Sequence, residues 1–134
     1  MATAYGQKPP AWFWIVGVAG LLWNLIGAAY YLGDVGVLGG AFAPPADRPE
    51  MPIWATAAFA IGVWGSVLAL VLLLMRNRLA RPLLWISFIA LIVDWTWVFF
   101  VSGAGIEPLG VAVLVIALLL ALLSDVAVKR GWLR

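Results

Sequence analysis

The sequence contains no cysteine and no histidine. Their absence excludes disulfides, zinc or haem sites built on these side chains, cysteine nucleophiles and Ser-His-Asp triads. It also removes the side chain that most often carries protons near neutral pH, so any proton chemistry falls to Asp, Glu, Lys, Arg or Tyr. We therefore expect a protein that holds no metal and no cofactor.

Charged residues are also scarce. They form 10% of the 134 residues, whereas 66% are hydrophobic. Soluble domains average about 25% charged residues, so this composition is typical of a polytopic membrane protein. The net charge of +2 does not indicate nucleic-acid binding, because the basic residues lie in short flanks between apolar runs and form no continuous basic face.

Four apolar runs are each long enough to cross a bilayer, which takes about 20 helical residues. Segments rich in glycine, proline or charge separate them. The first run is longer than the core of a signal peptide, so we expect it to remain as a span. The sequence predicts one all-α domain, a bundle of four transmembrane helices at about residues 11–33, 52–75, 82–102 and 109–128.

The basic residues predict how the bundle is oriented. With the N-terminus inside, seven of the eight Lys and Arg residues are cytoplasmic and only Arg48 is outside. This positive-inside bias predicts that both the N- and the C-terminus lie inside. We expect the bundle to lie in a bacterial-type inner membrane. Asp125 lies four residues before Lys129, a spacing that predicts a local ion pair near the cytoplasmic surface.

One carboxylate, Asp94, lies in the middle of the third apolar run. A charge at that depth costs about 3 kcal/mol on insertion scales, so it usually faces a bundle interior, a partner or a water-filled cavity. Counted from the ends of their runs at about 1.5 Å per residue, Asn24 and Ser66 reach a similar depth. These three side chains could exchange hydrogen bonds in a site without bulk water.

Tryptophans divide into two groups by depth. Five lie at the predicted span ends, where an aromatic belt is expected, and four lie deeper. Among the deeper ones, Trp97 is three residues after Asp94 and shares its helix face, while Trp95 is the less certain member. The predicted binding site, a polar centre walled by aromatic rings, comprises Asp94, Asn24, Trp97, Trp23, Ser66 and Trp64.

Two functions fit this set of residues. Polar groups beside flat apolar rings suit a polyhydroxy solute or an organic cation, which predicts a small-solute transporter or binder. Because four helices rarely enclose a path alone, that hypothesis also predicts a homo-oligomer. In the alternative, Asp94 bonds Asn24 or an indole N–H and stabilises the bundle of a non-transporting subunit that binds lipid or a partner protein. An enzyme is not expected, since no second acid, base or nucleophile converges on Asp94.

Three stretches carry a resemblance to a known group: PPAWFWIVGVAGLLWNLIGAAYY, PIWATAAFAIGVWGSVLALVLLLMRNRLARPLLW and the terminal KRGWLR. There the chain resembles small four-helix bacterial membrane proteins that are often described as sugar transporters. The resemblance covers nearly the whole chain and implies the four-span topology and a sugar-like solute. It carries no binding residues over to this sequence.

Overall fold

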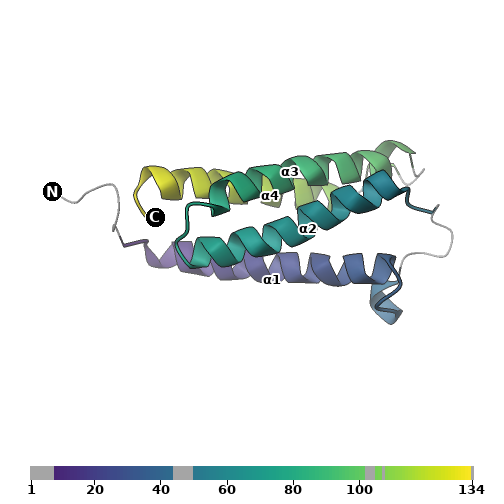
Figure 1. Cartoon of the computed structure of the whole chain (residues 1–134), viewed down its shortest axis with the longest axis horizontal. Helices are drawn as coiled ribbons and strands as arrows, with labels where there is room; N and C mark the ends of the chain where they lie inside the picture. Colours follow the sequence, from purple (N-terminus) through teal and green to yellow (C-terminus); the bar gives the residue numbers. More distant parts are fainter. Residues whose placement is uncertain (1–7, 44–49, 102–104, 107, 134) are drawn as a thin grey trace.

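The structure is a computed structural model, and it describes residues 8–43, 50–101, 105–106 and 108–133. Four long helices lie along a common axis (Figure 1). Each is long and apolar enough to cross a membrane, counting α3 together with the segment that continues it. The elements in chain order are α1 (Ala11–Asp34), the 3-10 turn η1 (Gly40–Phe42), α2 (Ile53–Leu74), α3 (Ala80–Thr96), the π-helical segment η2 (Trp97–Val101) and α4 (Pro108–Lys129).

The expectation of an all-helical, four-helix chain is therefore confirmed, with one difference in the third helix. It begins at Ala80, two residues before the expected start, and its last turn is π-helical. The expected end at Ser102 lies outside the described residues, as do most of the turn after it, the centre of the long connection that follows α1, and Arg48.

Prolines set three of the helix starts. Pro10 and Pro52 are the N-caps of α1 and α2 and have extended backbone, and Pro108 is the first residue of α4. Proline suits these positions because its fixed φ starts a helix and its missing N–H would have no partner there. Pro82 lies in the first turn of α3, where the same argument explains why the helix continues through it.

Three helices end in the same hydrogen-bonded motif. After α1, the N–H of Gly36 donates to the carbonyl of Gly33, and that of Val37 to Leu32. The pattern repeats at the ends of α2 and α4, and it satisfies carbonyls that a helix end leaves open. The motif needs a left-handed residue, which is glycine after α1 and α4 but Arg76, with φ of 59°, after α2.

The two ends of the bundle differ in charge. We call the end at which α1 begins, α4 ends and α2 turns into α3 the basic end (Figure 1), and the opposite end the loop end. Every Lys and Arg in the described part of the chain lies at the basic end: Lys8, Arg76, Arg78, Arg81, Lys129 and Arg130. Asp34 and Glu50 lie at the loop end.

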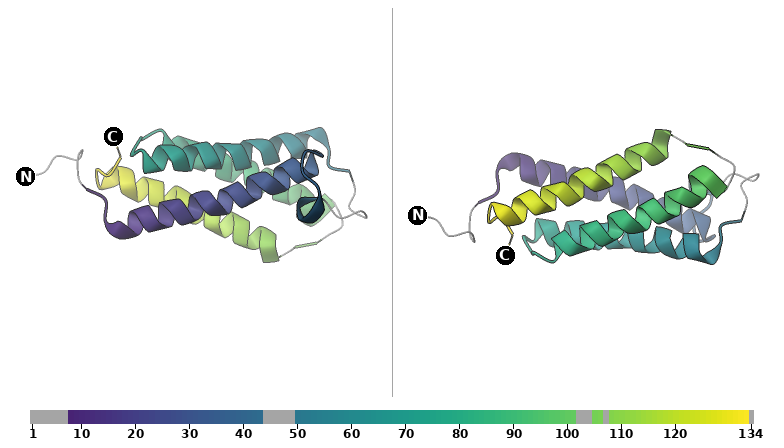
Figure 2. Two further views of the ribbon diagram at one scale, coloured as in Figure 1. Left: turned by 90° about the horizontal axis from the view of Figure 1, so that it is seen from below. Right: turned by 90° about the horizontal axis from the view of Figure 1, so that it is seen from above.

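The main apolar core lies nearer the basic end, where all four helices contribute to it. Antiparallel α2 and α3 form the closest pair, with α1 against α2 and α4 against α3. Figure 2 shows α1 and α4 crossing obliquely and moving apart toward the loop end. They approach each other at Gly20, whose missing side chain leaves room for Leu120. The bundle is thus closed at the basic end and looser at the loop end.

Candidate functional site

Two glycines of α2 fix how α2 and α3 are paired. A Cβ added at Gly65 would overlap the hydroxyl oxygen of Ser87, and one added at Gly62 would lie 2.6 Å from a methyl carbon of Leu91. The step from Ser87 forward to Leu91 on α3 therefore matches the step from Gly65 back to Gly62 on α2, as expected for antiparallel helices. Continued one turn further, the same register brings Asp94 to the level of Ala58.

Asp94 and Trp97 lie on the buried face of α3 and its continuation. Their exposed fractions are 2% and 3%. The buried residues of α3 follow at intervals of three or four, from Ala80 through Ser87 to Asp94, so one helical stripe faces the bundle interior. The π-helical segment starts at Trp97, directly after α3, and such segments are frequent at functional sites.

Asn24 lies elsewhere and bonds its own helix. Its Nδ2 donates to the carbonyl oxygen of Gly20 at 2.8 Å, and the residue is half-buried. On α1, Gly20 lies beside Leu70 and Gly27 beside Val63, which places Asn24 level with buried Ser66. Ser66 follows Gly65, and Gly65 packs on Ser87 of α3. Asn24 and Ser87 therefore lie at about the same height in the bundle.

The expectation that Asp94 lies at the same depth as Asn24 and Ser66 is therefore wrong. Asn24 and Ser66 do share a level, but Asp94 is seven residues beyond Ser87, about 10 Å along α3 toward the loop end. The depth count assumed that α1 and α3 begin at the same height. In the structure α1 begins well beyond the start of α3 at the basic end (Figure 1), so equal counts reach different heights.

The two remaining predicted residues lie away from Asp94. Trp64 is 42% exposed on α2, and its ring meets the edge of the Tyr31 ring of α1 at a centroid distance of 6.2 Å. Trp23 is half-buried on α1, next to Asn24. The structure thus brings Asp94 and Trp97 together on one face, and Asn24 and Ser66 to another level.

Sequence reasoning missed a polar contact between α3 and α4. Oδ1 of Asp125 accepts from Nε of Arg81 at 2.6 Å and from the indole Nε1 of Trp85 at 3.1 Å. The carboxylate was expected to pair with Lys129, so the observed pairing corrects that expectation. The signal was present at the start of α3, where arginine and tryptophan four residues apart share a helix face that α4 can cover.

The C-terminal segment closes the basic end. Trp132, expected in an aromatic belt, is only 6% exposed, and its ring packs edge-on against Trp12 and Phe13 at 5.5 and 5.6 Å. Its carbonyl accepts a hydrogen bond from Nε of Arg76 at 2.8 Å. The end of α4 is thereby attached both to the first turn of α1 and to the α2–α3 turn.

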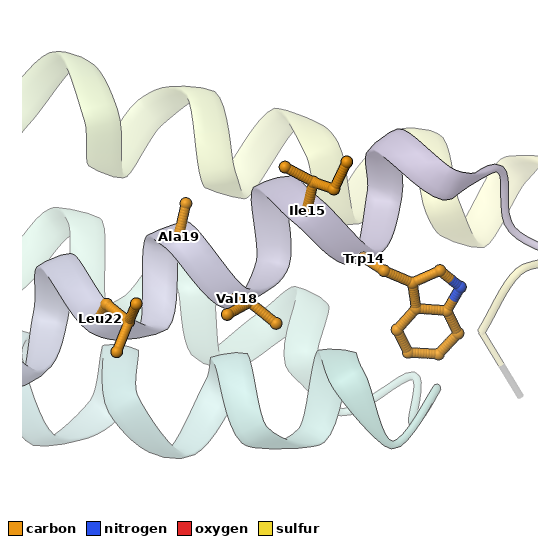
Figure 3. A pocket seen from close by; sticks show the side chains of 5 residues that line it. All are labelled: Trp14, Ile15, Val18, Ala19 and Leu22. Carbon is orange, nitrogen blue, oxygen red and sulfur yellow. The ribbon is translucent and has the colours of Figure 1, made fainter.

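A shallow apolar groove lies on the outer face of α1, and none of the predicted site residues lines it. Figure 3 shows the side chains that do, all from the basic-end half of α1. We call this feature the α1 groove; its residues are Trp14, Ile15, Val18, Ala19 and Leu22.

Chemically, the interior offers one carboxylate at the loop-end half and hydroxyl and amide groups at mid-height. Across the described ranges, no cluster of three or more Asp or Glu side chains could hold a metal ion. These features define an all-helical chain whose four main helices could each cross a membrane. No family model, curated protein or solved structure matches this chain.

Proposed function

We propose that this chain is a non-transporting subunit of a bacterial-type inner membrane, with four spans and both termini in the cytoplasm. It binds membrane lipid or another protein through its outer faces, and Asp94 stabilises the pairing of α2 with α3. This is the second of the two functions that the sequence left open.

The orientation rests on the charge of the two ends. The basic end carries every Lys and Arg among the residues described, and cytoplasmic flanks of membrane proteins are enriched in these residues. The exposed parts of all four helices carry large apolar side chains, such as Ile15, Ile61, Ile89 and Leu119. Such surfaces are suited to contact with lipid or with another apolar helix.

The burial of Asp94 is the observation that carries the proposal. Asp94 is 2% exposed, and the register of α2 on α3 brings it level with Ala58, which is 8% exposed. Both observations support a place for the carboxylate in the contact between these two helices. A solute site requires several polar groups around one space. Here Asn24 is already bonded to Gly20, and its level is about 10 Å from that of Asp94.

The test compares Asp94→Ala with Asp94→Asn in purified protein. If Asp94 stabilises the pairing of α2 with α3, Asp94→Ala leaves its interaction partner unsatisfied. The free energy of unfolding should then fall by about 1–3 kcal/mol, measured by helicity during denaturation in mixed micelles. Val93→Ala is the matched control, since Val93 is the neighbouring residue and is 42% exposed. Wild-type proteoliposomes should show no saturable uptake of labelled sugars.

A solute binder is the second candidate, favoured by Trp97. Its ring shares the buried face of Asp94 at the start of the π-helical segment, which pairs a carboxylate with an aromatic surface. This candidate predicts that Asp94→Asn keeps the stability of the fold but abolishes solute-dependent thermal stabilisation or flux. It also predicts a homo-oligomer. Saturable uptake that Asp94→Asn removes would replace the first proposal with this one.

A further inference from the structure

The α1 groove runs along the least enclosed helix of the bundle. Only 17% of the apolar window of α1 is buried, against 28–39% for the other three. Ala19 is the smallest residue that lines the groove. Ile15 and Ala19 point to one side of α1, and Val18 and Leu22 point to the other (Figure 3). From Trp14 to Leu22 the groove spans about 12 Å of helix. One leaflet of a bilayer contributes about 15 Å to the hydrocarbon core, so the two lengths are similar.

Cations gather at the basic end of the same helix. Lys8 precedes α1, and the contacts of Trp132 with Trp12 and Phe13 hold the end of α4 against the first turn of α1. Lys129 and Arg130 therefore lie near the level at which the α1 groove begins. Lys8, Lys129 and Arg130 are exposed, and none forms an ion pair with another residue that the structure describes.

We propose that the α1 groove and these three cations bind an anionic phospholipid of the cytoplasmic leaflet. One acyl chain lies along the groove, and the phosphate lies among Lys8, Lys129 and Arg130. The proposal rests on the function proposed above, because it names the partner of an outer face. Cationic residues next to a span attract anionic lipids, whereas they gain little from a zwitterionic headgroup.

A second copy of the chain is a poorer occupant of this groove. Two copies inserted in the same orientation and facing each other through α1 would bring both sets of cations together at one height. Like charges so placed repel each other. An anionic headgroup instead neutralises them, and the flexible acyl chain needs no complementary side chain at Ala19.

The experiment titrates the full chain in detergent with single lipids and measures bound lipid by native mass spectrometry. The probes are phosphatidylglycerol and phosphatidylcholine with identical acyl chains. We expect the first phosphatidylglycerol to bind the wild type at least tenfold more tightly than phosphatidylcholine. Removing a single cation should lower that preference roughly fivefold. The triple variant Lys8→Gln, Lys129→Gln, Arg130→Gln should bind the two lipids with equal affinity.

Two further variants separate charge from shape. Ala19→Trp fills the groove and should weaken the binding of both lipids several-fold. Ala57 is an exposed alanine of α2 near the loop end, and Ala57→Trp should leave the binding of both lipids unchanged. The double variant Lys8→Arg, Lys129→Arg keeps the charges and should keep the preference for phosphatidylglycerol.

Equal affinity for the two lipids, or a preference that survives in the triple variant, overturns the proposal. So does a dimer that Ala19→Trp dissociates, because the groove would then hold a second copy. These outcomes leave the proposed function standing. Conversely, saturable solute uptake contradicts the proposed function without altering the lipid titration, so the two failures are distinguishable.

Discussion

Gly65 is the position at which the packing of α2 on α3 can be tested most sharply. The hydroxyl oxygen of Ser87 occupies the space that a Cβ at Gly65 would need, and Ser87 is only 1% exposed. Gly65→Ala should therefore force the serine rotamer or the helices to move. Overpacking of this kind costs about 1–3 kcal/mol, although alanine recovers up to about 1 kcal/mol of helix propensity.

Ser87→Ala should relieve the clash and nothing else. The Cβ of Ser87 lies 3.7 Å from the position that the added methyl would take, an ordinary contact distance, so the double variant should fit. Within the described part of the chain Ser87 Oγ has no hydrogen-bond partner. Removing a buried hydroxyl of this kind is close to neutral or stabilising. The double variant should thus be at least as stable as the wild type, with a coupling energy of about 1–3 kcal/mol.

The assay is denaturation in mixed detergent micelles, followed by helicity, for the wild type, both single variants and the double variant. Gly27→Ala is the matched control, because the nearest atom to its added methyl is a methyl carbon of Val63 at 3.8 Å. If Gly65→Ala is tolerated as well as Gly27→Ala, and the two single effects simply add, the deduced register of α2 on α3 is wrong.

Two other contacts give independent predictions. Asp125→Asn should lower the free energy of unfolding by about 0.5–1 kcal/mol at low salt and by less at high salt, because the Arg81 side chain is 47% exposed. A double-mutant cycle with Arg81→Gln measures this effect, and an equal loss of stability in the Arg81→Gln background would contradict the prediction. Arg76→Gly should be more stable than Arg76→Ala by about 1 kcal/mol, because both lose the bond to Trp132 but only glycine adopts positive φ without strain. Equal stability of the two variants in the same denaturation assay would show that φ at this position carries no strain.

The helices could be predicted from the sequence because their limits are local. The length and apolar content of each run predict a helix long enough to cross a membrane, and proline and glycine mark where the helix starts and ends. Pro10, Pro52 and Pro108 stand at three of the starts, and Gly36 and Gly131 just beyond two of the ends. The π-helical turn after Thr96 has no such mark, and neither has the left-handed conformation of Arg76.

The site could be predicted only in part because it depends on how far the helices are shifted along one another. That Asp94 and Trp97 share a face follows from their spacing of three residues. The height of Asn24 relative to Asp94 depends on the stagger of α1 against α3, which the tilt of the helices and the packing at Gly20 and Gly27 determine. No count along a single helix contains that information.

The position of Asp94 in the fold also bears on its role. It belongs to the α2–α3 pair, the closest in the bundle, where Gly62 and Gly65 let the backbones approach. The looser seam lies between α1 and α4, which move apart toward the loop end (Figure 2). A solute path would open most readily where packing is weakest, and Asp94 lies instead in the pair that must hold for the bundle to persist. The placement of Asp94 therefore supports the proposal that its carboxylate stabilises helix pairing and does not line a solute path.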